Sequence, residues 1–180
     1  MQNVSDIVLR QKSEIEGLSN ERFVKRDIVI GEGLLRSNMI KAVLGPRRAG
    51  KSVFSIQNIK DRRYAYLNFD EEQLVRVDDY DVFLKGLREV YGNFDVLLLD
   101  EIQNLSNWEL FVNRLQRSGL NLIITGSNSR FLGRELATHL TGRYIPLLIL
   151  PFSFREFLRA RDVDISGHKL ALREKQGEIL

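Results

Sequence analysis

Short apolar runs alternate along the chain with stretches in which apolar residues recur every three to four positions. A continuous apolar run is typical of a strand buried on both faces, and the three-to-four spacing is typical of an amphipathic helix. The runs predict strands over residues 39–44, 64–69, 94–99, 120–125 and 144–150. The spacing predicts helices over residues 2–16, 53–60, 79–91 and 108–117, and a fifth from the turn at 126–129 to about residue 139.

This alternation predicts an α/β fold with a doubly wound, mainly parallel five-stranded sheet, flanked by helices and joined by right-handed crossovers. Pro146 lies within the last predicted strand and has no N–H to donate, so we expect that strand at an edge of the sheet. Residues 22–30 form a basic, β-favouring stretch. Phe154, Phe157 and Leu158 fall on one helical face, which is typical of a core or of a contact between domains.

Residues 45–52 read GPRRAGKS and match the phosphate-binding pattern G-x-x-x-x-G-K-[ST] at every fixed position. Gly45 and Gly50 allow a tight turn and a close approach to phosphates because they have no Cβ. We expect Lys51 to reach the β- and γ-phosphates and the Ser52 hydroxyl to bind Mg²⁺. A chance Gly-Lys-Ser turn is disfavoured by the apolar strand before it and the helix after it. The predicted nucleotide-binding residues are Gly45, Pro46, Arg47, Arg48, Ala49, Gly50, Lys51, Ser52 and Val53.

Two acids, Asp100 and Glu101, follow the apolar run that ends at Leu99. The carboxyl end of a strand is where ligands bind in parallel sheets of this kind. We expect Asp100 to hold Mg²⁺ and Glu101 to polarise the attacking water, since phosphoryl transfer needs both a metal and an oriented nucleophile. In the alternative interpretation, Asp100 caps a helix and Glu101 is solvated. Gln103 could orient Glu101 or simply belong to a turn.

Polar residues also follow the strand that ends at Thr125. We expect Asn128, or else Ser127, to hydrogen-bond the attacking water or the γ-phosphate and so to distinguish ATP from ADP. The alternative is an ordinary turn with a helix cap, and the sequence leaves both open. Asp70, at the end of the second strand, could join the outer shell of the metal, although capping the following turn is the better-supported role.

Arginines supply a further group of candidates. Arg143 follows Gly142 directly before the last strand, where an arginine can reach the γ-phosphate of a neighbouring molecule and stabilise the transition state. A surface arginine or an ion pair is the alternative. Arg47 and Arg48 are not required by the phosphate-loop pattern, and the sequence leaves open whether they face a phosphate, a partner or water.

The composition sets limits on function. The chain has 180 residues, of which 43% are hydrophobic and 28% charged, as expected for one soluble globular domain. It has no cysteine, which excludes disulfides and thiolate metal sites. No apolar run approaches the roughly 20 residues of a membrane span, so we expect no membrane partner and a cytoplasmic location. The net charge of +3 permits DNA binding without implying it.

Five segments together resemble a known family, and they cover residues 40–160 approximately. They are KAVLGPRRAGKS (41–52), YLNFDEE (66–72), LLLDEIQNLSNWELFVNRL (97–115), IITGSNSRFLGRELATHLTGRY (123–144) and LILPFSFREFL (148–158). The family is that of archaeal and bacterial P-loop ATPases of the AAA+ type, in which an AAA domain precedes an uncharacterised C-terminal region. The resemblance implies a P-loop NTPase fold whose sensor strand lies between the phosphate-loop strand and the Asp-Glu strand.

The resemblance also implies ligands and roles. ATP and Mg²⁺ would be bound, Asn128 would occupy the sensor position, and Arg143 would be the arginine finger of a homo-oligomer. We expect three parts: a helical and basic lead-in (1–37), the ATPase core (38–160) and the start of a C-terminal extension (161–180). Because members of the family usually continue with a lid and a further domain, we expect the chain to be truncated.

Two functions are compatible with these features. The first is Mg²⁺-dependent ATP hydrolysis by a motor or switch that acts on a macromolecule, with DNA as the first candidate. The second is a binding module that nucleotide occupancy controls and that has negligible turnover. Glu101 favours the first, because a switch can dispense with a catalytic base. A GTPase is disfavoured because no Asn-Lys-x-Asp motif is present. A small-molecule kinase stays open as an alternative, although the sequence shows no dedicated acceptor site.

Overall fold

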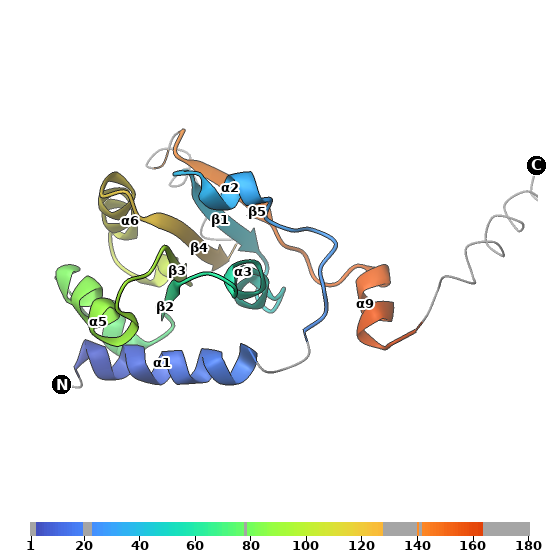
Figure 1. Ribbon diagram of the computed structural model, residues 1–180, viewed down its shortest axis with the longest axis horizontal. Helices are drawn as coiled ribbons and strands as arrows, with labels where there is room; N and C mark the ends of the chain where they lie inside the picture. The colour runs from blue at the N-terminus through green and yellow to red at the C-terminus, as the bar shows by residue number, and fades with distance from the viewer. Residues whose placement is uncertain (1–2, 20–22, 78, 128–139, 141, 164–180) are drawn as a thin grey trace, which may run out of the picture. The chain divides into compact units, whose positions relative to one another are not determined.

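The computed structural model describes residues 3–19, 23–77, 79–127, 140 and 142–163. Its helices are α1 (Val4–Ser19), α2 (Glu32–Arg36), α3 (Lys51–Ile59), α4 (Glu72–Val75), α5 (Asp81–Tyr91), α6 (Trp108–Arg117) and α9 (Phe154–Ala160), with the 3₁₀ turn η1 (Ile102–Asn104) (Figure 1). Its strands are β1 (Ile40–Gly45), β2 (Tyr64–Asn68), β3 (Val96–Asp100), β4 (Asn121–Ser127) and β5 (Tyr144–Leu148). The fifth predicted helix, which follows the turn at 126–129 and runs to about residue 139, lies outside the described residues, because 128–139 are not among them.

The five strands form one sheet in the order β2-β3-β4-β1-β5, and every neighbouring pair is parallel. The predicted parallel α/β sheet is therefore confirmed. β4 lies between β1 and β3, the position that the family resemblance implies for the sensor strand. β5 is an edge strand, as predicted, and such a strand tolerates Pro146 because the missing N–H need not pair with a further strand.

Helices cover both faces of the sheet, which explains why the strands are continuous apolar runs. One buried cluster joins α1, α5 and α6 to the sheet through residues such as Phe83, Phe111 and Leu97. The other cluster joins α2 and α3 to the opposite face through Phe54 and Leu98. Figure 1 shows α1 running beside α5 along the β2 side of the sheet.

The N-terminal helix α1 covers the exposed edge of β2. The side-chain amide of Gln11 donates to the Asn68 carbonyl at 3.0 Å and accepts from the Asn68 N–H at 2.9 Å. Gln11 therefore pairs with the peptide group of an edge strand as a further strand would, and α1 blocks an edge that would otherwise be open to association.

A lysine is buried in the middle layer of the fold. Lys41 of β1 is fully buried, and its Nζ donates to the Ser37 carbonyl at 2.6 Å and to Asn121 Oδ1 at 2.7 Å. Burial lowers the pKa of Lys41 to about 8, and the charge of Arg62 acts in the same direction. Because α2 ends just before Ser37, this ammonium group joins the end of α2 to the first residues of β1 and β4.

Two compact units can be separated by their internal contacts, and the described residues of the smaller one are 23–28 and 152–163. Within it, Ser153 and Glu156 form a capping box at the start of α9. The buried carboxylate of Glu156 also accepts from Arg26 Nε at 2.9 Å and from the Asp27 N–H at 2.8 Å. Burial alone would raise the pKa of Glu156, but these hydrogen bonds outweigh it and lower the pKa to about 2.

Three details differ from the sequence-based expectations. The β-favouring stretch at 22–30 contains no strand within residues 23–30. The strand predicted to end at Thr125 continues to Ser127. Phe154 and Phe157 are 77% and 45% exposed, so the apolar face of α9 is not a core in the part of the chain that the structure describes.

Candidate functional site

The phosphate loop connects β1 to α3, and its two glycines are required for different reasons. A Cβ on Gly45 would lie 2.0 Å from the carbonyl oxygen of Ile149, so only glycine fits beside that backbone. Gly50 precedes α3 with φ +86°, in the left-handed region that favours glycine. Between them, Ala49 is buried and its N–H donates to the Pro46 carbonyl at 3.3 Å. The sequence pattern therefore corresponds to a formed loop at the N-terminus of a helix, where backbone N–H groups favour an anion.

Lys51, the first residue of α3, has its Nζ between the phosphate loop and the residue that follows β3. It is only 4% exposed, and its Nζ donates to the Pro46 carbonyl at 3.2 Å. The same Nζ lies 3.5 Å from Oε1 of Glu101. The structure thus brings together the two residues that the sequence assigned to phosphate binding and to water activation. Val53 follows within α3 and is half-buried.

Asp100 is the last residue of β3, and its carboxylate is almost completely buried. It accepts hydrogen bonds from three hydroxyls: Tyr66, at 2.9 Å, Thr125 and Ser52. Burial raises the pKa of Asp100, and the hydrogen bonds act in the opposite direction. The carboxylate is therefore not a helix cap, which was the alternative interpretation of the sequence. It lies within hydrogen-bonding distance of the serine that the loop motif assigns to the metal.

Glu101 has an unusual backbone conformation for a residue other than glycine, with φ +48°. Its N–H donates to Thr125 Oγ1 at 3.0 Å, and its Oε2 accepts from Gln103 Nε2 at 2.5 Å. Gln103 therefore contacts Glu101 directly, so of the two roles left open by the sequence, orientation of Glu101 is the one that its contacts support. Thr125 bonds to both acids and fixes the end of β3 to the end of β4.

Sequence reasoning missed Tyr66 and Thr125. Both side chains belong to strands beside β3, and each donates a hydroxyl hydrogen to Asp100. A signal was available only for Thr125, which is a polar residue directly before the Gly-Ser turn in an otherwise apolar strand. Nothing local to Tyr66 indicates its partner, because the contact depends on the pairing of β2 with β3.

Of the two sensor candidates, Ser127 and Asn128, the structure describes only Ser127. Ser127 is half-buried at the end of β4, in register with Gly45 at the start of the phosphate loop. Asn128, the first choice from sequence, lies outside the described residues. The structure therefore places the end of the sensor strand beside the loop, and the role of Asn128 stays a prediction.

Arg143 lies at the opposite end of the sheet from the phosphate loop. Its carbonyl accepts from the N–H of Ile40, the first residue of β1, and its exposed guanidinium donates to Asn113 Oδ1 at 3.2 Å. The loop begins five residues further along β1, which corresponds to about 17 Å at 3.3 Å per residue. Arg143 is therefore not brought to the phosphate loop of its own chain.

A hollow of about 490 Å³ opens beside the loop and is lined by Arg47, Arg48, Asp70 and Glu101. Its volume is in the range of small-ligand sites. Asp70 accepts a hydrogen bond from Asn104 at 2.8 Å, so it is held at this edge by the turn after β3.

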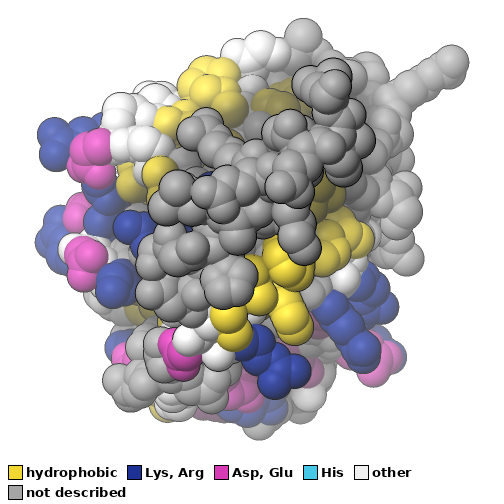
Figure 2. Space-filling model, turned by 90° about the vertical axis from the view of Figure 1, so that its right-hand side faces the viewer, with side chains coloured by type: hydrophobic (Ala, Val, Ile, Leu, Met, Phe, Trp, Pro, Cys, Tyr) yellow, Lys and Arg dark blue, Asp and Glu magenta, His cyan; other side chains and the backbone are white. Residues whose placement is uncertain are grey.

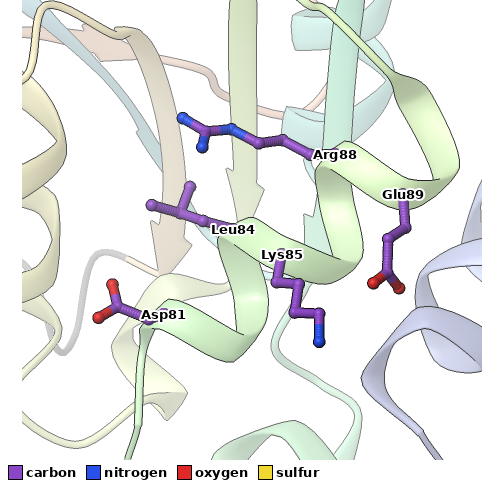
Figure 3. Close-up of a pocket in the computed structure, with 5 residues that line it drawn as sticks. All are labelled: Asp81, Leu84, Lys85, Arg88 and Glu89. Carbon is purple, nitrogen blue, oxygen red and sulfur yellow. The ribbon is translucent and has the colours of Figure 1, made fainter.

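A second hollow of similar size lies along α5 and differs in chemistry (Figure 3). Its lining residues are Asp81, Leu84, Lys85, Arg88 and Glu89, all from that one helix. Figure 3 shows Arg88 and Leu84 on one side of the helix and Lys85 and Glu89 on another. None of its lining residues belongs to the phosphate loop, so the first hollow is the candidate site.

The donor atoms beside the loop fit a magnesium ion. Mg²⁺ prefers oxygen ligands and is commonly bound by one or two protein groups together with substrate phosphates. The Ser52 hydroxyl and the Asp100 carboxylate are such a pair, and they already contact each other. Within the described ranges, no group of three or more His, Cys, Asp or Glu residues that could hold a metal is found.

The sequence matches a protein family described as an AAA domain over residues 37–158, which is more than half of the chain. The chain belongs to this family. The chain is also 37% identical over 182 aligned positions to an uncharacterised protein of Methanocaldococcus jannaschii, with 92% of this chain and 41% of that protein covered. It is 38% identical over 140 positions to an uncharacterised protein of Haemophilus influenzae, with 71% of this chain and 35% of that protein covered. The chain thus spans less than half the length of these relatives.

Solved structures similar to this chain include the following two. One is Hsp104 in its closed state with ATPyS and FITC casein, with 15% identity, a TM-score of 0.49, and coverage of 89% of this chain and 31% of that chain. The other is PCH-2 of C. elegans, with 15% identity, a TM-score of 0.43, and coverage of 84% and 44%. At this level of similarity neither neighbour bears on function. Within the described residues of the AAA domain, no helix is long and apolar enough to cross a membrane.

Proposed function

We propose that this AAA domain binds ATP together with Mg²⁺ and hydrolyses it. The observation that carries the proposal is the meeting of Lys51 and Glu101 at 3.5 Å, next to the contact between Ser52 and Asp100. These four residues come from the phosphate loop and from the end of β3, which is separated from β1 by one strand. Membership of the AAA family supports a nucleotide-binding, ATPase-like function independently of this geometry.

Each residue has a proposed role that follows from its chemistry. The loop N–H groups and Lys51 bind the phosphates, and Ser52 and Asp100 hold Mg²⁺, which when bound supplies positive charge to the β- and γ-phosphate oxygens. Glu101 accepts a proton from the attacking water. Two hydrogen bonds support the orientation of Glu101: its N–H donates to Thr125 Oγ1, and its Oε2 accepts from Gln103 Nε2.

The position of Arg143 supports a role in trans and not in cis. An exposed guanidinium at the far end of the sheet is available to the nucleotide of a neighbouring subunit, and it stabilises transition-state charge if it reaches the γ-phosphate. The proposal therefore includes a homo-oligomer in which Arg143 of one subunit faces the loop of the next. Asn128 remains the proposed sensor of the γ-phosphate.

The macromolecule on which the domain acts is a separate question. Net charge +3 permits DNA binding. Figure 2 shows basic and acidic side chains interspersed on the face that it presents, which is unlike the single-sign surface expected of a DNA-binding face. A motor or switch acting on a macromolecule is the proposal that fits the family, and DNA is one candidate to be tested in the same assays.

A binding module without turnover is the second candidate, and Glu101 discriminates between the two. With Mg²⁺ and ATP, Glu101→Gln should lower phosphate release by about 100-fold or more while ATP remains bound, because the amide cannot accept the proton. Asp61→Asn is a matched control, since Asp61 is an exposed acid between α3 and the start of β2, at the opposite end of the sheet. Arg143→Ala should slow turnover only under conditions in which the protein is assembled.

The outcomes separate the two functions. Phosphate release that is unchanged in Glu101→Gln contradicts hydrolysis at this site. ATP binding without turnover in the wild type, at concentrations where the protein is oligomeric, establishes the binding module instead. Including duplex DNA in parallel reactions tests whether turnover responds to that partner.

A further inference from the structure

Two arginines at the tip of the phosphate loop have no side-chain partner among the residues that the structure describes. Arg47 and Arg48 are both exposed, and neither side chain forms a hydrogen bond or ion pair with a residue that the structure describes. Other exposed arginines of the same unit, such as Arg63 with Asp95 and Arg76 with Glu72, do form ion pairs. The charge of the loop arginines is therefore available to a ligand.

These arginines line the same hollow as Glu101. On this edge of the sheet the hollow has guanidinium groups from the loop and carboxylates from Asp70 and Glu101, yet Arg47 and Arg48 pair with neither acid. A ligand that enters the hollow must therefore match the charges of both the arginines and the acids. Its negative charge would face the loop arginines, and its bound cation would offset the acids. A magnesium-bound polyphosphate has both properties, whereas the continuous polyanion of a nucleic acid would meet the two carboxylates unshielded.

The backbone of Arg48 adds a second, independent observation. Its φ is +63°, in the left-handed region, where a residue with a long side chain costs conformational energy that glycine would avoid. Glycine would fit this turn of the loop more easily than arginine. The loop therefore has an arginine at a position where the backbone conformation favours glycine. Strained residues of this kind are common at sites that contact a ligand.

The position of Arg47 and Arg48 within the site indicates which phosphate of the nucleotide they contact. A phosphate loop and its lysine cradle the β-phosphate, and the residue that activates water faces the terminal phosphate. Groups that share a hollow with Glu101 therefore face the γ-phosphate and not the β-phosphate. We propose that Arg47 and Arg48 contact the γ-phosphate of ATP bound to their own chain, so that the domain prefers ATP to ADP. This inference rests on the proposed function of the site, and it differs from the role of Arg143, which lies at the other end of the sheet.

Nucleotide binding to the full 180-residue chain tests the inference. The dissociation constants of ATP and ADP with Mg²⁺ are measured by calorimetry for wild type, Arg47→Ala, Arg48→Gly and the double variant. Because a charge-assisted contact is lost only from ATP, the double variant should weaken ATP binding by about tenfold or more and ADP binding by less than about threefold. Arg48→Gly relieves the left-handed strain, so its thermal midpoint should be unchanged or higher while its ATP preference falls.

Arg117→Ala is the matched control. Arg117 is also exposed and has no side-chain partner among the described residues, but it ends α6 just before β4 begins, at the opposite end of the sheet from the loop. It should leave both dissociation constants unchanged.

Each outcome decides the inference separately from the proposed function. If the wild type binds neither nucleotide, the proposed function fails and this inference fails with it. If the wild type binds ATP and the double variant loses ATP and ADP binding equally, or loses neither, the inference is overturned while the nucleotide site stands. If the ATP preference is unchanged but binding of a DNA duplex is lost, the two arginines serve nucleic acid and the inference is also overturned.

Discussion

Replacement of the buried lysine in β1 should make the stability of the protein depend less on pH. Lys41 is fully buried, and its acceptors among the described residues are two uncharged oxygens, those of Ser37 and Asn121. Its pKa is lowered from 10.5 to about 8, mainly by burial. In the unfolded chain the lysine regains its ordinary pKa, so between these two values the unfolded state binds a proton that the folded state does not.

The sign and size of the effect follow from this difference. Where the unfolded state binds more protons, the free energy of unfolding rises with pH. The cost of holding a charged Lys41 in the fold is therefore greatest below pH 8 and disappears as pH rises toward 10.5. The difference between the two pKa values corresponds to about 3 kcal/mol, of which about 2 kcal/mol is regained between about pH 7 and pH 9.5.

The assay compares wild type with Lys41→Met by urea unfolding at both pH values. Methionine keeps the length and apolar stem of the side chain but cannot titrate, so other titrating groups cancel in the difference. The wild type should gain about 2 kcal/mol relative to Lys41→Met between about pH 7 and pH 9.5. The exposed Lys60, changed to Met, is the control and should show no such gain. A difference that is the same at both pH values, or that falls with pH, would refute the reasoning.

Two further predictions concern buried carboxylates. Tyr66→Phe removes one of three hydroxyl donors to Asp100 and should lower the free energy of unfolding by about 1–3 kcal/mol in urea titrations, since a buried acceptor loses a partner; an unchanged value would contradict the buried hydrogen bond. Glu156→Gln should loosen α9 at neutral pH, seen as reduced protection of its amides from hydrogen exchange. Because the pKa of Glu156 is lowered to about 2, its stabilising contribution is complete above the ordinary value of 4.5 and is lost as the pH falls toward 2, so wild type and variant should converge in acid. Equal protection of the two proteins at neutral pH would refute this.

Several parts of the fold followed from the sequence because they depend on local pattern. The strands β1 to β4 are continuous apolar runs, and burial on both faces by α3 on one side and α5 and α6 on the other explains that pattern. Pro146 predicted an edge strand because a missing N–H is a local property with a fixed consequence in a sheet. Short elements such as α2, with five residues, and η1, with three, were missed because they span too few residues to show a period.

The site was predictable in part for the same reason. The glycines of the loop, Lys51 and Ser52 form a motif within eight consecutive residues, so their spacing alone was informative. The partners of Asp100 were not predictable, because Tyr66 and Thr125 reach it only through the pairing of β2 and β4 with β3. The extension of β4 to Ser127 likewise reflects its register with Gly45 and not a local apolar run.

The sequence by itself determined that a phosphate loop follows one buried strand and that an Asp-Glu pair ends another. Both are local patterns, with glycines set by backbone geometry and acids set by the end of an apolar run. Only the tertiary structure decided that Lys51 meets Glu101, that three hydroxyls converge on Asp100, and that Arg143 lies too far along the sheet to act on its own chain. Those relations depend on strand order and register, which bring together residues far apart in the chain and separate others by the length of a strand.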